Sequence, residues 1–439
     1  MTITILGSQF GDEGKGGIVD VFSEPADIIV RYQGGDNAGH TVVKDDNEYK
    51  LSLIPSGVIR GKTGVIGNGC VINPRTLFEE IDSLQERGVV PNVKVAKRAH
   101  VILPFHRTLD GIEEASKSDS DKEIGTTGRG IGPTYEDKAA RRGIRVADLL
   151  DPDTLYDKLE YLVRQKRTYI NKVFDTDVED QLNFDAIYSE YSGYGERLNE
   201  ANMTVNCGNF LASRLSSGEM IVFEGAQGTH LDIDHGNYPY VTSSNPSAGY
   251  AGTGSGLGPS IIGNGDIIGV VKSYLSRVGS GPLPTELSGD IAETIREEGG
   301  EYGTVTGRPR RIGWLDMPML RHTTRVNGLT GIAINHIDVL SGISEIKVCA
   351  EYITDNESLQ TVPTTARKWE DCEPNYRTFQ GWPDVDWEYI SKQGYSELPS
   401  EAKEYIEYIE SELGIPAIAI GVGPERDATI IRSHPLEEG

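Results

Sequence analysis

The first stretch whose residue types suit chemistry is GSQFGDEGKGG, residues 7–17, which follows the apolar run TITIL. Glycine N–H groups in such a loop can converge on a phosphate, and the positive end of a following helix and the charge of Lys15 add to the attraction. The usual P-loop has Ser or Thr after the lysine, whereas this chain has Gly16. Asp12 is then the nearest group that could hold Mg²⁺. The alternative is a tight strand-to-helix turn with a surface Asp-Glu pair.

Two further polar segments could bind an anionic ligand. RYQGGDNAGHT, residues 31–41, follows an apolar run, so it should lie at the same sheet edge as the first loop. Within it His40 is a candidate acid, although a structural or surface histidine is as plausible. GTTGRGIGPTYEDKAARRG, residues 125–143, concentrates hydroxyls and guanidiniums, which suit a phosphate. A surface held by salt bridges is the alternative for these arginines.

Three later segments complete the candidate site. FEGAQGTHLDIDHGNYPYVTSSN, residues 223–245, places Gln227 after a strand and Thr242 among hydroxyls and amides; its His and Asp residues match no standard zinc spacing, so a metal site there is not favoured. The AGTGSGLG run that follows matches no nucleotide or nucleophile motif and is expected to be a flexible turn. TVTGRPRR, residues 304–311, suits a carboxylate or phosphate ligand. Asp338 in NHID could accept hydrogen bonds from guanine, which adenine cannot donate.

The elements that must position these segments follow from the apolar pattern. Short runs, apolar on both faces, predict strands buried between helix layers at residues 2–6, 27–30, 64–67, 100–103, 219–225, 266–271, 331–340, 346–352 and 417–423. Helical spacing predicts helices that begin near Asn73-Pro74 and that end before Gly414. Residues 104–145 and 225–260 are polar or glycine-rich and are expected to be loops around a site. The pattern predicts an α/β fold with a large central, mostly parallel sheet, in one domain over residues 1–439.

Composition and charge argue against several classes of protein function. The net charge of −25 argues against nucleic-acid binding. An acidic, well-solvated surface of this kind suits solubility at high ionic strength, as in a halophilic cytoplasm. No apolar run approaches a bilayer span and no signal peptide is evident, which predicts a cytoplasmic protein without membrane partners. The four cysteines lie far apart and are expected to be reduced thiols.

Together the six segments resemble the adenylosuccinate synthetase family, in order and with matching spacing from residue 3 to the C-terminus. The motifs are GDEGKG, QGGDNAGHT, GTTGRGIGP with YEDK, FEGAQGT with DIDHGNYPYVTSSN, and GRPRRIGWLD. The resemblance implies a P-loop-NTPase-like fold with long active-site loops. It also implies an enzyme of AMP biosynthesis that joins IMP to L-aspartate, with GTP and Mg²⁺, through 6-phosphoryl-IMP. It also implies a homodimer in which Arg141 acts in trans. Another GTP-dependent nucleotide kinase or GTPase on a related scaffold is the alternative.

The resemblance also implies residue roles. The catalytic set is Asp12, the base on N1 of IMP, with His40, Lys15 and Gln227. The GTP set is Gly11, Asp12, Glu13, Gly14, Lys15, Gly16, Gly17, Gly39, His40, Thr41, Arg310, His336, Ile337, Asp338, Gly421, Val422 and Gly423. The IMP set is Asp12, Lys15, Asn37, Ala38, Gly39, His40, Thr127, Arg141, Gln227, Thr242 and Arg308. The aspartate set is Thr304, Val305, Thr306, Gly307, Arg308 and Arg310. One Mg²⁺ per subunit would be held by Asp12 and the Gly39 carbonyl.

Three positions depart from the family pattern. His336 stands where the guanine segment usually has Lys, and Gly421 stands where the last turn usually has Ser. Both changes would affect the strength of guanine binding, although Asp338 is retained. Val305 replaces a Thr in the aspartate loop, which removes one hydroxyl and predicts weaker or rearranged carboxylate contacts.

Overall fold

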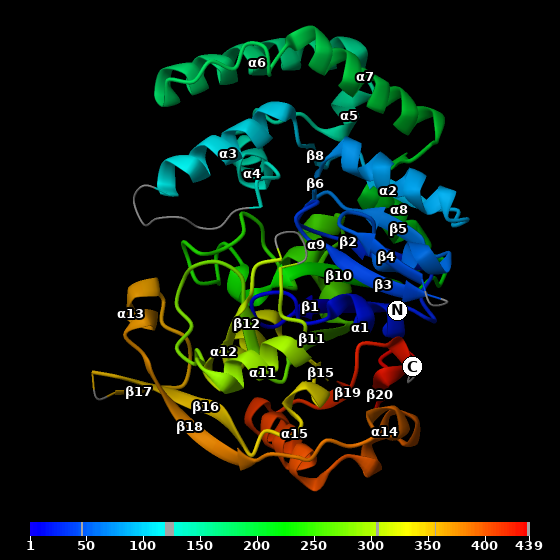
Figure 1. Cartoon of the computed structure of the whole chain (residues 1–439). Helices are drawn as coiled ribbons and strands as arrows, with labels where there is room; N and C mark the ends of the chain where they lie inside the picture. Colours follow the sequence, from blue (N-terminus) through cyan, green and yellow to red (C-terminus); the bar gives the residue numbers. More distant parts are fainter. Residues whose placement is uncertain (45–46, 119–126, 304–306, 356, 437–439) are drawn as a thin grey trace.

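A ten-stranded sheet forms the centre of the molecule (Figure 1). The computed structural model describes residues 1–44, 47–118, 127–303, 307–355 and 357–436. In sheet order the strands are β20 (Thr429–Ile431), β19 (Ala417–Gly421), β15 (Gly331–Asn335), β11 (Asp266–Lys272), β1 (Thr2–Gly7), β10 (Ile221–Gly228), β2 (Ile28–Arg31), β5 (Thr63–Ile66), β7 (Val93–Ala96) and β9 (Thr204–Val205). Only the edge strand β20 pairs antiparallel, so the predicted α/β fold with a mostly parallel sheet is confirmed.

Strand β1 illustrates why the sheet is buried on both faces. All six of its residues are buried. Ile3 and Ile5 pack with Phe22 of α1 (Lys15–Phe22) in one core cluster, whereas Leu6 belongs to the cluster on the other face. A strand that is apolar on both faces is stable only between two layers, and here both layers are present.

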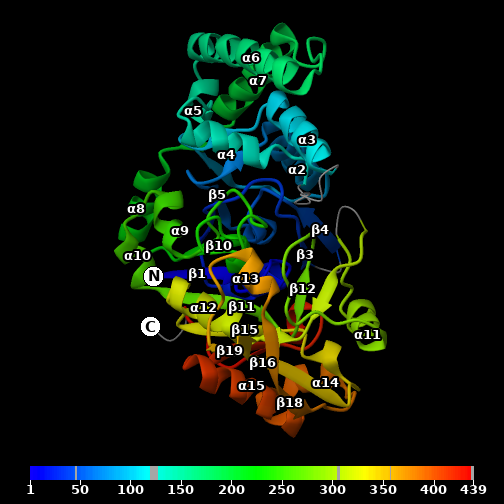
Figure 2. The ribbon, with the colours of Figure 1, turned by 90° about the vertical axis from the view of Figure 1, so that its left-hand side faces the viewer.

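The helices cover the sheet and extend beyond it. They are α2 (Pro74–Glu86), α3 (Pro104–Ser118), α4 (Ile131–Ala139), α5 (Val146–Leu149), α6 (Pro152–Phe174), α7 (Phe184–Glu200), α8 (Cys207–Ser216), α9 (Gly249–Ser255), α10 (Pro259–Gly263), α11 (Asp290–Glu298), α12 (Met317–Asn327), α13 (Ala366–Glu370), α14 (Trp387–Gln393) and α15 (Ser400–Leu413). Helices α2 and α15 confirm the two helices predicted from spacing. Helices α6 and α7 form a layer at one end of the molecule, away from the sheet, in both views (Figure 2).

The remaining strands form smaller sheets outside the central sheet. They are β3 (His40–Lys44) with β4 (Asn47–Leu51), β6 (Val71–Ile72) with β8 (His100–Val101), β12 (Leu275–Arg277) with β13 (Arg311–Gly313), and a sheet of β14 (Leu315–Asp316), β16 (Glu345–Thr354), β17 (Glu357–Leu359) and β18 (Glu373–Gln380). Short 3₁₀ turns cover Ser56–Arg60, Thr229–Leu231, Asp338–Leu340, Tyr395–Glu397 and Arg426–Ala428.

The structure corrects several predicted elements. The predicted strand 346–352 is β16, which lies outside the central sheet, and the strand predicted at 100–103 is the short β8. The strand predicted over 331–340 ends at Asn335, because His336 adopts a left-handed φ of 64° that no strand continues through. The AGTGSGLG turn is largely helix α9. That residues 1–439 form one domain stays a prediction.

The expectation of loops over residues 104–145 is wrong, since this region holds α3 and α4. The buried residues of α4 include Thr134, whose hydroxyl donates to the Gly130 carbonyl, and Asp137, which contacts His106 and Lys166, so the buried face of this helix is partly polar. Within the part of the chain that the structure describes, no helix is long and apolar enough to cross a membrane. All four cysteines are buried and free, as expected.

Candidate active site

The loop between β1 and α1 is folded around its own glutamate. Oε1 of Glu13 accepts hydrogen bonds from the backbone N–H groups of Gln9 (3.0 Å) and Gly11 (2.8 Å), and Oε2 lies 2.7 Å from Nζ of Lys15. The glutamate is fully buried, so its side chain supports the loop from inside. Gly14 N-caps α1 at a φ of 80°. The loop thus presents Gly14, Gly16 and Gly17 at the N-terminus of α1, where an anion is favoured.

Asp12 is the carboxylate that this loop turns outward. Its φ of 59° is in the left-handed region, which aspartate tolerates better than most residues. Its side chain is 42% exposed, and Oδ2 lies 3.1 Å from Nη2 of Arg310. The carboxylate is therefore accessible and already paired with a cation from a distant segment.

The loop after β2 meets the first loop, as the sheet topology predicts. Strands β1 and β2 are parallel neighbours of β10, so their carboxyl ends lie at one edge. Nε2 of Gln227 donates to Oδ1 of Asn37 at 3.2 Å, and the Cα of Gln227 lies 3.6 Å from where a Cβ on Gly11 would be. Three predicted segments therefore converge here. Ala38 and His40 flank the exposed Gly39, and Thr41 follows His40.

His40 begins β3 beside the N-terminus of α1. A Cβ on Gly16 would lie 3.7 Å from the Cβ of His40. Nδ1 of His40 is 3.3 Å from the Ala38 carbonyl, whereas Nε2 is buried and has no protein partner. Burial lowers the pKa of His40 because desolvation disfavours the imidazolium, and the nearby Glu224 carboxylate only partly opposes this. The unliganded chain thus holds a neutral histidine with one free ring nitrogen.

The predicted guanine segments lie side by side next to the first loop. The Ile337 N–H donates to the Gly421 carbonyl at 3.2 Å, and Nδ2 of Asn335 donates to the Glu13 carbonyl at 2.8 Å. Val422 is buried and Gly423 half-buried beside them. These contacts join three segments far apart in the sequence at the carboxyl ends of β1, β15 and β19.

Burial shifts the pKa of two side chains in this region. Oδ1 of Asp338 is buried without a hydrogen-bond partner, and burial raises the pKa of Asp338 to about 6. A pair of N–H donors would satisfy this carboxylate and lower its pKa again. His336 is neutral, since burial lowers its pKa to about 4, and its ring lies edge-on to Tyr274. The usual lysine would add a charge at this position, whereas His336 offers a neutral ring.

The structure gives a steric reason for a glycine at position 421, which the sequence alone did not reveal. A Cβ at this position would lie 2.4 Å from Oδ1 of Asn335. The side chain of Asn335 holds the Glu13 carbonyl, so a serine here would displace the support of the phosphate loop.

We therefore expect Gly421→Ser to weaken GTP use, although serine is the usual residue. The KM for GTP should rise about tenfold, a loss of about 1.4 kcal/mol, with the KM for IMP unchanged. Overpacking of this kind should also cost about 1–3 kcal/mol of stability. Steady-state kinetics and thermal unfolding measure both. Gly193→Ser is the matched control, because nothing lies within 4 Å of its Cβ position. A serine variant with equal or lower KM for GTP would contradict this account.

The two segments that flank the predicted aspartate residues pair with each other. The Arg310 N–H donates to the Glu301 carbonyl at 2.8 Å, and the Gly303 N–H donates to the Arg308 carbonyl at 2.8 Å. Gly307 and Arg308 are exposed. Thr304, Val305 and Thr306 lie outside the described residues. The second of the two segments reaches Asp12 through Arg310.

The remaining predicted IMP residues lie on separate loops. Arg141 is exposed at a φ of 61° on the turn after α4. Thr127 is exposed ahead of α4, and Thr242 is half-buried on the loop after β10. Ser243 approaches Gly132 of α4, so the Thr242 loop and the α4 segment are neighbours. Among the contacts of the described residues, none joins Arg141 to Asp12.

Sequence reasoning missed the buried charges that hold these loops. Asp137 accepts from His106 (3.0 Å), Lys166 (2.8 Å) and Arg142 (2.6 Å), which fixes the turn that displays Arg141. Asp36 accepts from Asn73 and Thr76, each at 3.0 Å, below the Asn37 loop. Glu301 likewise accepts a hydrogen bond from Nη1 of Arg310 at 2.8 Å. The signal in the sequence is their position: Asp137 lies within YEDK, Asp36 lies within QGGDNAGHT, and Glu301 lies just before TVTGRPRR.

The His and Asp residues at 230–235 support a loop. Asp232 is buried and accepts from the Asp234 N–H at 2.9 Å and from Nδ2 of Asn245 at 3.1 Å. Nε2 of His230 is 3.1 Å from the Met319 carbonyl. Among the described residues, no three His, Cys, Asp or Glu side chains are grouped to hold a metal.

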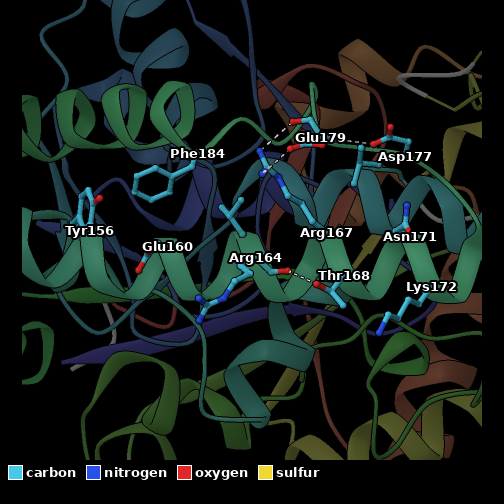
Figure 3. A pocket seen from close by; sticks show the side chains of 12 residues that line it. Tyr156, Glu160, Arg164, Arg167, Thr168, Asn171, Lys172, Asp177, Glu179 and Phe184 are labelled. Carbon is cyan, nitrogen blue, oxygen red and sulfur yellow. Dashed lines mark hydrogen bonds and ion pairs between the residues drawn. The ribbon is translucent and has the colours of Figure 1, made fainter.

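A separate hollow of about 590 Å³ lies between α6 and the segment that leads to α7 (Figure 3). Tyr156 and Phe184 lie at one end, and Arg167 and Glu179 pair across it. None of the predicted site residues lines it, so it is distinct from the site at the sheet edge.

Comparisons with known proteins agree with this geometry. The family model described as adenylosuccinate synthetase matches residues 4–430. Adenylosuccinate synthetases of Haloarcula marismortui and Halobacterium salinarum are each 61% identical, over 99% and 100% of this chain respectively and 100% of each relative. The fully ligated adenylosuccinate synthetase of Plasmodium falciparum superposes with a TM-score of 0.90 at 38% identity, over 98% of this chain and 99% of that one. The chain therefore belongs to the adenylosuccinate synthetase family.

Proposed function

We propose that the chain joins IMP to L-aspartate with GTP, through 6-phosphoryl-IMP, to give adenylosuccinate, GDP and phosphate. The observation that carries this is a set of buried polar atoms without protein partners: Nε2 of His40, Oε1 of Gln227, Nε of Arg310 and Oδ1 of Asp338. Buried polar groups are normally satisfied. Each of these belongs to a residue expected to contact a substrate, and together they offer the donors and acceptors that bound nucleotides would complete.

The chemistry follows from the placement of Asp12. O6 of neutral IMP is a poor nucleophile, and removal of the N1 proton by Asp12 puts negative charge on it. O6 then attacks the γ-phosphorus of GTP, and the bond to the GDP oxygen breaks. Lys15 and a protonated His40 neutralise charge on the transferred group. The aspartate amine next attacks C6, and phosphate leaves as a far better leaving group than hydroxide.

The residues fit a hard divalent cation. A carboxylate, Asp12, and a main-chain carbonyl, Gly39, are oxygen donors of the type that Mg²⁺ prefers, and both lie on exposed backbone in loops that meet at Gly16 and His40. When bound, Mg²⁺ would neutralise negative charge on the phosphates. Arg310 would have to release Asp12 for this to happen.

The site requires a further cation for the IMP phosphate. Asn37, Thr127 and Thr242 supply amide and hydroxyl groups, but Arg141 is on a rigid turn directed to the surface, held there through Arg142 and Asp137. We infer that Arg141 serves the site of a partner in a homodimer.

The test is an assay with IMP, GTP, Mg²⁺ and aspartate, followed by the ultraviolet change of adenylosuccinate and by phosphate release. We expect one phosphate per adenylosuccinate and no sustained phosphate release without aspartate. Sustained GTP hydrolysis without aspartate would favour a GTPase or nucleotide kinase, which the family membership does not. ATP lacks the pair of guanine N–H groups that would donate to Asp338. We therefore expect that ATP does not support the reaction.

A further inference from the structure

Four charged side chains form a row of ion pairs that ends at Asp12. Nζ of Lys272 lies 2.6 Å from Oε1 of Glu301, Oε2 of Glu301 lies 2.8 Å from Nη1 of Arg310, and Nη2 of Arg310 lies 3.1 Å from Oδ2 of Asp12. The side chains of Lys272 and Glu301 are each 1% exposed, and that of Arg310 is 11% exposed. The charges alternate in sign and sum to zero, so the three buried side chains and the exposed Asp12 carboxylate together carry no net charge.

Glu301 is the centre of this cluster. Its Oε1 also accepts a hydrogen bond from the Tyr274 hydroxyl at 2.7 Å, while Oε2 faces Arg310. Burial opposes the charged form, but Lys272 and Tyr274 outweigh it and lower the pKa of Glu301 to about 2. Glu301 is therefore a fixed carboxylate with one oxygen committed to the core and the other to Arg310.

The two edges of Arg310 have different environments. Nη1 is held by a buried, immobile carboxylate, whereas Nη2 contacts the accessible Asp12. When Asp12 turns to its own ligands, Nη2 is released but Nη1 is not. The planar guanidinium then stays in place, with Nη2 ready for a ligand anion. Without Glu301, Asp12 would be the one ion-pair partner left to Arg310 among the described residues.

We propose that Glu301 is a positioning residue, which holds Arg310 so that this arginine pairs with Asp12 before substrates bind and with a substrate anion afterwards. This proposal rests on the proposed function. Lys272 and Tyr274 fix Glu301 in turn, and because Lys272 pairs in register with Asn335, the same support reaches the guanine segment.

The test compares Glu301→Gln with wild type after the ligation activity of wild type has been established. We expect the KM for GTP and the KM for aspartate to rise about tenfold or more, and kcat to fall about tenfold or more. Each tenfold change corresponds to about 1.4 kcal/mol. IMP affinity, measured by calorimetry, should stay within about threefold, about 0.7 kcal/mol. Glu412→Gln is the matched control, because it removes a glutamate from an ion pair with Arg321 that includes none of the predicted site residues.

A double-mutant cycle separates positioning from general support. In an Arg310→Ala background the Glu301→Gln change should have almost no further kinetic effect, because its target is gone. An equal loss with and without Arg310, or unchanged kinetics of the single variant, would overturn the proposal. If Glu301→Gln does not fold, Tyr274→Phe removes one hydrogen bond to Glu301 and should shift the same constants in the same direction. Absence of ligation by wild type would instead refute the proposed function.

Discussion

Asp12→Asn is expected to lower kcat by about 10³-fold, within the range of about 10²–10⁴ that a positioned general base supplies. The amide cannot accept the N1 proton of IMP, so O6 stays uncharged and does not attack GTP. Asparagine is the right replacement because it tolerates the left-handed φ of 59°. Arg310 keeps its bond to Glu301 in this variant, so no buried cation is stranded.

The measurement is single-turnover kinetics with calorimetric binding of IMP. Binding of IMP should persist, because the side chain of Asp12 is 42% exposed and supports no core contact. Asp12→Ala would not serve, since alanine is strained at a positive φ and could displace the loop. A variant that retains more than about a tenth of the wild-type rate, about 1.4 kcal/mol in the barrier, would assign the base elsewhere.

The same variant tests whether Arg141 acts across subunits. Asp12→Asn and Arg141→Leu subunits should each be inactive alone. In a mixed dimer one site combines an intact Asp12 with an intact Arg141 of the other subunit, so equal mixing should restore about a quarter of wild-type activity. No recovery in demonstrably mixed dimers would place Arg141 in its own subunit's site.

The glycine-rich loops could be predicted because their chemistry is local. A loop that follows a buried parallel strand must lie at the carboxyl edge of the sheet, and Asp12, Asn37 and Asp338 do so. Gln227, predicted to follow a strand that ends at residue 225, instead lies within the last residues of β10 at the same edge. The strand order that places β10 between β1 and β2 needed the structure, but the shared edge did not.

The supporting charges could not be predicted, because a buried and an exposed glutamate look alike in a sequence. Glu301 and Glu297 are four residues apart, yet only Glu301 meets a buried lysine, and that lysine is 29 residues earlier on β11. Helix α4 was not predicted, for a related reason. It buries Asp137 against His106 and Lys166, so the usual apolar stripe of a helix is replaced by a polar network.

His40→Gln should remove proton uptake on GTP binding and lower kcat by about 10²-fold or more. In the unliganded chain burial lowers the pKa of His40, so the ring is neutral near pH 7. A phosphoryl group beside the free Nε2 would raise that pKa, because it favours the imidazolium. GTP binding should then take up a proton, and the affinity for GTP should fall as pH rises through the raised pKa of the complex.

Calorimetry of GTP binding in buffers with different ionisation enthalpies measures the number of protons taken up. The wild type should take up the most protons at pH values between the lowered pKa of His40 in the free chain and its raised pKa in the complex, and His40→Gln should take up none. His235→Gln is the matched control, because His235 is exposed and its side chain is outside the site. Equal proton uptake by wild type and His40→Gln would mean that the imidazolium is not formed at this position. The charge on the transferred phosphoryl group would then be neutralised by Lys15 and Arg310 without help from a proton.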